Sequence, residues 1–290
     1  MRALAEFIMR GRTQACAVAL LGSLFPLVSP ATVGLVTLRK GSSQGLLVLL
    51  WALLPLIANF FLSQGSHLLP LVSMASLAMM LVSANVLRLT VSWQWTMMAS
   101  MLVAAAVAVA VGLVFGSEVE LLIEELNKAI AEVTAQQDSK QTAPFIAGPQ
   151  YVLGLIALVL AASAIVSLFV SRWWQALLYN PGGFSEEFHS LRLDSKVAAA
   201  LLIGVILGTF LPRGYEFWAG LMAIPLLIAG IALVHHSVRV LKLNGAWLGF
   251  MYFGLLVFGP MVGALLVGLS FADSMVNLRS RLAANNNRQP

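Results

Sequence analysis

Eight stretches of this chain contain no charged residue and have about the length that a membrane helix needs. A helix must present about 20 apolar residues to cross roughly 30 Å of hydrocarbon. The stretches cover residues 14–38, 44–64, 68–87, 95–116, 145–171, 197–211, 217–234 and 246–272. Charged residues make up only 10% of the chain, too few to cover a soluble surface. The sequence therefore predicts an all-α, polytopic bundle of about 8 transmembrane segments, a single integral-membrane domain over residues 1–290.

Proline interrupts the first and the last of these segments. Pro26 and Pro30 lie within the first, and Pro260 lies within the last. If both segments cross the bilayer once, the basic residues divide almost evenly between its two sides. If both fold back at proline as re-entrant segments, only Lys128, Lys140 and Arg213 of the 17 basic residues lie outside. The excess of basic residues in cytoplasmic loops favours the second arrangement, with the N-terminus in the cytoplasm, over two spans that are only kinked.

Residues 117–144 form the one sizeable polar segment. They carry six of the 12 acidic residues of the chain and only two lysines. Ser117 and Glu120 have the spacing of a capping box, and Leu122 and Leu126 begin an apolar stripe at helical spacing. We expect an acidic amphipathic helix and a linker outside the bilayer, on the extracytoplasmic side. The helix is either a lid or docking element or a plain connection between spans.

Catalytic and metal-binding patterns are missing from the sequence. It contains no H-E-x-x-H, G-x-S-x-G or Walker A motif and no paired Cys/His pattern. We therefore expect no enzyme activity, no metal and no cofactor. The net charge of +5 is dispersed between apolar runs, which argues against nucleic acid as a partner. Because the segments lack internal charges, a proton-driven pump is disfavoured, and a pocket for a neutral ligand remains open.

Four residues are candidates for contacting such a ligand. Asn59 lies in the middle of the second segment, and Asn85 lies nearer the end of the third. Pro26 and Pro30 would free backbone groups where the first segment breaks. The alternative role of the two asparagines is hydrogen bonding between neighbouring helices.

Five further residues are candidates for docking a membrane protein partner. Ala15 and Ala19 have the spacing that lets two membrane helices approach closely. Trp173, Trp174 and Asn180 belong to a loop that suits the headgroup level of the bilayer. Anchoring of that loop to the lipid surface is the alternative.

Three passages carry a resemblance to a known family. They are Phe25-Pro26 through Gly41, the loop from Trp173 to Phe184, and the ending from Gly268 through Asp273 to Arg279. Together they resemble the YybS-like family of bacterial membrane proteins, which has no assigned function. That family is distantly similar to the S-components of energy-coupling-factor vitamin transporters, which dock the transmembrane transporter module through small residues. Ala15 and Ala19 of this chain loosely match that docking pattern, so the resemblance implies a transporter module as a possible partner.

The resemblance implies a multi-pass protein of the bacterial inner membrane. It also implies a subunit that binds a small solute, of unknown identity, or is associated with its transport. The alternative is a scaffold that does not transport and that recruits envelope or cytoplasmic partners through residues 117–140 and the loop 173–196.

Overall fold

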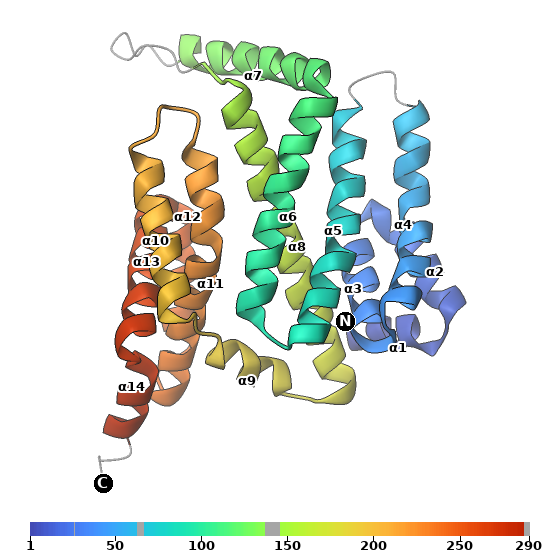
Figure 1. Ribbon diagram of the computed structural model, residues 1–290. Helices are drawn as coiled ribbons and strands as arrows, with labels where there is room; N and C mark the ends of the chain where they lie inside the picture. The colour runs from blue at the N-terminus through green and yellow to red at the C-terminus, as the bar shows by residue number, and fades with distance from the viewer. Residues whose placement is uncertain (26, 63–66, 137–145, 287–290) are drawn as a thin grey trace.

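The computed structural model describes residues 1–25, 27–62, 67–136 and 146–286 (Figure 1). These residues form α-helices and one short 3-10 helix, with no strand among them. In chain order the helices are α1 (Arg2–Arg10), α2 (Arg12–Leu21), η1 (Gly22–Leu24), α3 (Val28–Lys40), α4 (Ser42–Leu62), α5 (Leu68–Thr90), α6 (Trp93–Val114), α7 (Gly116–Gln136), α8 (Pro149–Tyr179), α9 (Gly183–Ser190), α10 (Ser195–Thr209), α11 (Glu216–Val240), α12 (Ala246–Val257), α13 (Gly259–Val276) and α14 (Leu278–Asn286). The prediction of an all-α bundle is confirmed.

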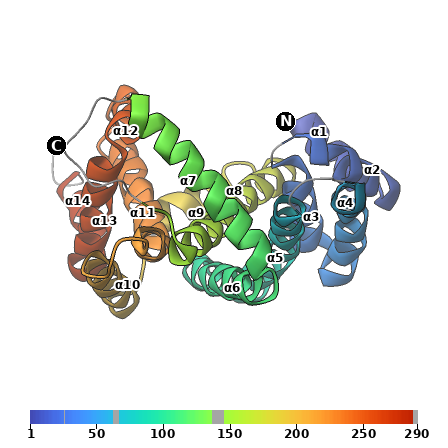
Figure 2. The same ribbon diagram turned by 90° about the horizontal axis from the view of Figure 1, so that it is seen from above.

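Six of these helices are long and apolar enough to cross a membrane: α4, α5, α6, α8, α11 and α13. The helices α10 and α12 are apolar but shorter. The long helices run side by side and alternate in direction, and α8 lies among its neighbours at the centre of the bundle (Figures 1 and 2). The window that defines the span in α8 is 56% buried, against 22–39% for the other five spans. The chain is therefore an integral membrane protein organised around α8.

The first apolar segment is broken, as the arrangement with re-entrant segments predicts. The helix α2 ends at Leu21, and α3 begins at Val28 after the 3-10 turn. Helices of 10 and 13 residues reach only about 15 Å and 20 Å, so neither half crosses the hydrocarbon. Every residue of α3 from Ala31 to Leu38 is buried, and this part of the chain lies beside the lower part of α4 and α5 (Figure 1).

The last apolar segment is also broken, but into unequal halves, because α12 has 12 residues whereas α13 has 18 and is itself one of the six candidate spans. The helix α12 ends at Val257, Phe258 leaves the helical conformation, and α13 begins at Gly259 with Pro260 in its first turn. Proline fits there because the first N–H groups of a helix have no intrahelical acceptor. The chain enters and leaves this pair of helices from the same end of the bundle, where α14 also lies (Figure 1).

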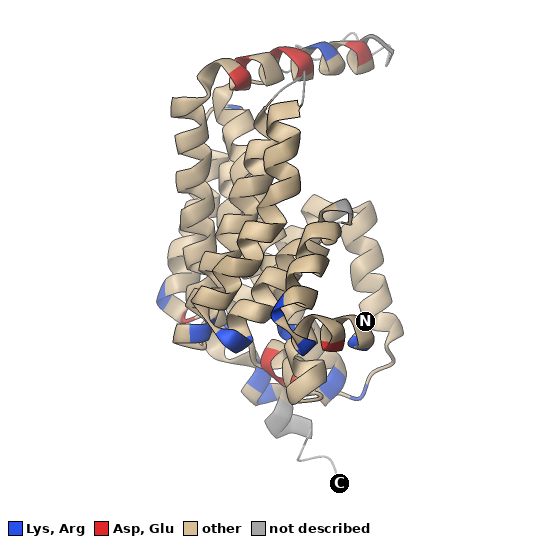
Figure 3. Cartoon of the chain, turned by 90° about the vertical axis from the view of Figure 1, so that its right-hand side faces the viewer, with Lys and Arg blue, Asp and Glu red and all other residues tan. Residues whose placement is uncertain are grey.

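The charges divide between the two ends of the bundle, as Figure 3 shows. Among the described residues, Lys128 of α7 and Arg213 between α10 and α11 are the only Lys or Arg at the end where α7 lies. The other described basic residues lie at the opposite end, which we call the basic end. This distribution agrees with the broken-segment arrangement and disagrees with an even division of charge.

The acidic helix α7 lies across the top of the bundle (Figures 1 and 2). Its apolar residues Val119, Leu122 and Leu126 pack on the main hydrophobic core. The Asn127 side chain hydrogen-bonds the backbone of Ala147 twice, with Nδ2 donating to the carbonyl at 3.1 Å and Oδ1 accepting from the N–H at 2.7 Å. The helix predicted within residues 117–144 is therefore present and attached to the bundle, while residues 137–145 lie outside the described residues.

Candidate functional site

A pocket of about 270 Å³ lies where the first segment breaks, and we call it the mid-bundle pocket. Its walls come from the α2–α3 break and from helices α4, α5 and α8. Ser163, at the middle of the 31-residue helix α8, lines it, which places the pocket near the middle of the bundle. In membrane proteins, non-helical backbone at such depth is tolerated where it is buried in protein or lines a cavity.

The backbone at the break is held in an unusual conformation. Leu27 has φ 69° and ψ −15°, in the left-handed region that a leucine rarely adopts. The hydroxyl of Ser29 donates a hydrogen bond of 2.5 Å to the carbonyl of Ala19, which ties the start of α3 to α2. Such a conformation persists only where surrounding contacts impose it, and it is commonest at functional sites.

Five serines line the mid-bundle pocket, and no described charged residue does. The hydroxyls of Ser23, Ser29 and Ser73 donate to backbone carbonyls. Those of Ser76 and Ser163 make no hydrogen bond to another described residue. Both side chains are partly exposed, so these two hydroxyls are accessible for binding a solute or water.

The four predicted ligand residues have different environments. Pro30 lines the mid-bundle pocket, and Pro26 lies outside the described residues. The prediction that Asn59 is a buried polar group is wrong, because it is exposed in the last turn of α4. Asn85 accepts a hydrogen bond from Ser42 at 2.7 Å and donates one to Leu81 at 2.9 Å. Asn85 thus joins α4 to α5, away from the pocket.

The five residues predicted to dock a partner differ in their exposure. Ala15 and Ala19 are 1% and 0% exposed, so α2 uses them for contacts inside the chain and leaves no partner surface there. Trp174 is 2% exposed and packs in the cluster that contains Ala15 and Ala19, so it too cannot meet a partner. Trp173 and Asn180 are exposed and remain accessible from outside the bundle.

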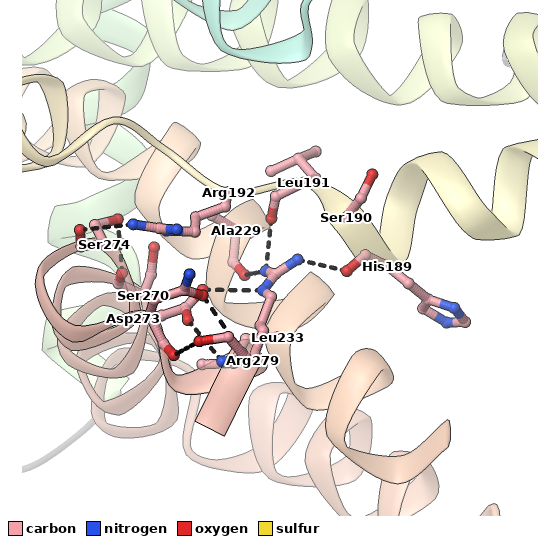
Figure 4. A network of polar contacts seen from close by, with 12 residues as sticks. His189, Ser190, Leu191, Arg192, Ala229, Leu233, Ser270, Asp273, Ser274 and Arg279 are labelled. Atoms are coloured by element: carbon pink, nitrogen blue, oxygen red, sulfur yellow. Dashed lines mark hydrogen bonds and ion pairs between the residues drawn. The ribbon is translucent and has the colours of Figure 1, made fainter. Parts of the chain in front are cut away.

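A buried ion pair joins the C-terminal helices to the rest of the bundle (Figure 4). The Nε of Arg279 donates to Asp273 at 2.9 Å, and the two side chains are 8% and 2% exposed. The other guanidinium nitrogens donate to the carbonyls of His189 at 2.5 Å, Leu191 at 2.6 Å and Ala229 at 3.3 Å. Burial lowers the pKa of Arg279, and the Asp273 carboxylate opposes that shift.

This network is structural, because it is enclosed by the elements that it connects. Sequence reasoning did not identify Asp273 as a buried charge, although a lone carboxylate six residues before an arginine at the end of a span is a usable signal. No group of three or more His, Cys, Asp or Glu that could hold a metal ion occurs in the described part of the chain.

Comparison with family models, with curated proteins and with solved structures finds no match to this chain. The fold and the mid-bundle pocket define its class directly, as an α-helical integral membrane protein with a serine-containing, mainly apolar pocket at a broken helix. The resemblance to the YybS-like family stays a prediction.

Proposed function

We propose that this protein binds a small, neutral, partly apolar solute in the mid-bundle pocket, as a transport-associated membrane subunit. One observation carries the proposal: Ser76 and Ser163, whose hydroxyls make no hydrogen bond to another described residue, line a pocket at a helix break. A volume of about 270 Å³ is close to the lower limit of roughly 300 Å³ for ligand pockets. The absence of described charges in the lining favours a neutral ligand.

The start of α3 adds a second element of recognition. The first N–H groups of a helix have no intrahelical acceptor and carry partial positive charge. Ser29 and Pro30, in the first turn of α3, line the pocket. Pro30 has no N–H and the Val28 N–H donates to the carbonyl of Phe25, so the N–H of Ser29 is the one available in this turn. In transporters, broken helices present such ends to their substrates near the middle of the bilayer. A solute with a carbonyl or hydroxyl group therefore fits this end of the pocket, and its apolar part fits Leu56 and Leu77.

Retention of a co-purified solute tests the proposal. We expect mass spectrometry of the purified protein to detect one small molecule that is lost from the variant Ser76→Ala/Ser163→Ala. The control is Ser83→Ala, which removes a buried hydroxyl from the same helix α5 but from a pair with Ser100 at 2.8 Å, outside the pocket. Equal retention by wild type and the double variant would count against the pocket.

Transport is tested separately. Uptake of vitamin-like solutes into cells with and without the protein should differ for at least one solute. No difference for any solute would remove the transport role and leave solute binding alone.

We also propose an orientation and a location. The positive-inside rule places the basic end in the cytoplasm and α7 on the extracytoplasmic face. With the resemblance to the YybS-like family, this supports a bacterial inner-membrane protein.

A scaffold role is the second candidate function. It is favoured by the exposure of Glu120, Glu124, Glu125 and Glu132 on α7. Crosslinking should then recover one dominant partner, which deletion of residues 117–140 should abolish. Unchanged recovery after the deletion would exclude α7 as the recruiting element.

A further inference from the structure

A second pocket, of about 480 Å³, lies at the basic end, and we call it the arginine pocket. The end of α5, the start of α6, the end of α8 and the region of α9 meet there. Its lining includes Arg88, Arg172 and Arg192, with Glu187 as the only carboxylate among the described lining residues. Three guanidinium groups and one carboxylate leave a surplus of positive charge on the lining of this pocket, where Arg88 and Arg192 are exposed.

One of the three arginines, Arg172, already has an ion-pair partner and a hydrogen-bond partner within the chain. Arg172 forms an ion pair with Glu187, and its Nη1 donates to the Gln175 side chain at 2.6 Å. Both partners of the ion pair are about one-third exposed or less, and they hold α8 to α9. The carboxylate of Glu187 is thus engaged by Arg172 and does not neutralise the other two arginines.

The remaining two arginines have free donors. Arg88 makes no hydrogen bond or ion pair to another described residue, and Arg192 donates only to the carbonyl of Ser274, at 3.2 Å. A guanidinium group carries five N–H donors in a planar fork. Most of the donors of Arg88 and Arg192 therefore have no acceptor among the described residues.

The Arg88 side chain reaches the turn between α3 and α4. Its guanidinium lies against Gly41, in the turn between α3 and α4, where an added Cβ would be 2.7 Å from Nη1. Gly41 also has φ +96°, a conformation that favours glycine. A Cβ at this position would displace the end of the flexible Arg88 side chain and would be strained by the positive φ. The pocket also receives the start of α6, at Ser92 and Trp93, where helix N–H groups lack intrahelical acceptors.

We propose that the arginine pocket binds a phosphate-bearing anion through Arg88 and Arg192. Guanidinium groups match phosphate oxygens in charge and in bidentate geometry, and helix N-termini favour anions. At the basic end of a membrane bundle, the phosphate comes either from an anionic lipid headgroup or from a soluble phosphate compound. The chemistry of recognition is the same for both sources. This site is separate from the mid-bundle pocket, so either proposal can fail alone.

Two binding measurements on the full-length protein distinguish the sources. Equilibrium dialysis of delipidated protein with radiolabelled inorganic phosphate tests the soluble source. Native mass spectrometry of protein released from vesicles of phosphatidylglycerol and phosphatidylcholine tests the lipid source. Saturable phosphate binding or selective retention of one phosphatidylglycerol supports the proposal and identifies its source. Binding in neither measurement overturns it.

Charge-matched variants test whether the pocket is responsible. Arg88→Gln/Arg192→Gln removes two charges from the pocket, while Arg12→Gln/Lys196→Gln removes two exposed charges from the same end, outside it. We expect binding to weaken at least about tenfold in the first variant and less than about twofold in the second. Equal weakening in both would show attraction to net charge alone and overturn the pocket assignment. An unchanged affinity in the first variant would do the same.

Gly41→Ala provides a variant that leaves every charge in place. It should weaken binding by displacing Arg88, and thermal unfolding of each variant confirms that the fold is retained. Full affinity in a folded Gly41→Ala protein would contradict the role assigned to Arg88.

Discussion

Removing the carboxylate of Asp273 should destabilise the protein more than any surface substitution at the basic end. Asp273 and Arg279 are 1% and 7% exposed, so the substitution Asp273→Ala leaves a guanidinium buried without a counter-charge. The hydrogen bonds from Arg279 to the carbonyls of His189, Leu191 and Ala229 do not replace that charge. Breaking a buried pair by deleting one partner destabilises proteins by about 3–5 kcal/mol. We expect a loss in this range in the free energy of unfolding.

The double variant Asp273→Ala/Arg279→Met separates charge pairing from packing. Removing both charges avoids the unpaired ion but leaves three carbonyls without the guanidinium. We therefore expect the double variant to lose at least about 1–2 kcal/mol less than the sum of the two single losses, as coupled groups do. Additive losses would mean that the two groups act independently.

Unfolding can be followed through the only cysteine in the chain. Cys16 is 7% exposed and lies in α2, so a thiol-reactive dye labels it when the bundle opens. Denaturant titrations in mixed micelles then yield the free energy for wild type, both single variants and the double variant. A loss below about 1 kcal/mol for Asp273→Ala would refute the reasoning, because it would mean that water reaches Arg279. The surface control Lys196→Gln should change stability by about 0.5 kcal/mol or less.

Three further predictions concern helix packing, pH and orientation. Gly230→Ala places a Cβ against the backbone carbonyl oxygen of Leu266, so it should separate α11 from α13 and destabilise the protein by about 1–3 kcal/mol. The control Gly268→Ala, whose added Cβ has no atom within 4 Å, should leave stability unchanged in the same titration. Burial, together with the adjacent Arg239, lowers the pKa of His189, so the folded chain binds fewer protons than the unfolded chain between the lowered value and about 6.5. Stability should therefore fall as the pH drops through that window, and His189→Gln should reduce the fall in melting temperature; an equal fall in the variant would assign the effect to other groups. Topology reporters at both termini should give cytoplasmic signals and one at position 136 an extracytoplasmic signal, and a cytoplasmic signal at 136 would reverse or disprove the orientation.

The helical segments and their breaks could be predicted because single-sequence signals specify them. Charge-free runs mark the spans, and prolines mark both interruptions. The distribution of Lys and Arg favours the re-entrant arrangement over two kinked spans, because that arrangement gathers the basic residues on one side of the membrane. Each of these signals is local or additive along the chain, so no knowledge of helix–helix contacts is needed.

The helix faces could not be predicted, because lipid and protein interior are both apolar. Asn59 was expected inside the bundle and lies outside, and Trp174 was expected at a partner surface and lies in the core. In a soluble helix, a polar face identifies the side that meets water, but a membrane span such as α4 has no such face. The spacing of small residues alone also does not identify helix contacts. Gly208, four residues after Gly204, lies close to Ala219 of α11, whereas Gly263, four residues after Gly259, has no atom within 4 Å of an added Cβ.

The two pockets differ in whether the residues that indicate them are close together or far apart in the sequence. The mid-bundle pocket adjoins a proline-marked break, so its position follows from the first segment and only its other walls require tertiary contacts. The arginine pocket combines Arg88 and Arg192, which are far apart in the chain and each look like an ordinary charge at the end of a span. What distinguishes them is that Glu187 is already paired with Arg172, a fact that only the folded arrangement of α8 and α9 contains. The surplus of positive charge in the arginine pocket can therefore be recognised only after each neighbouring carboxylate has been assigned to its ion-pair partner.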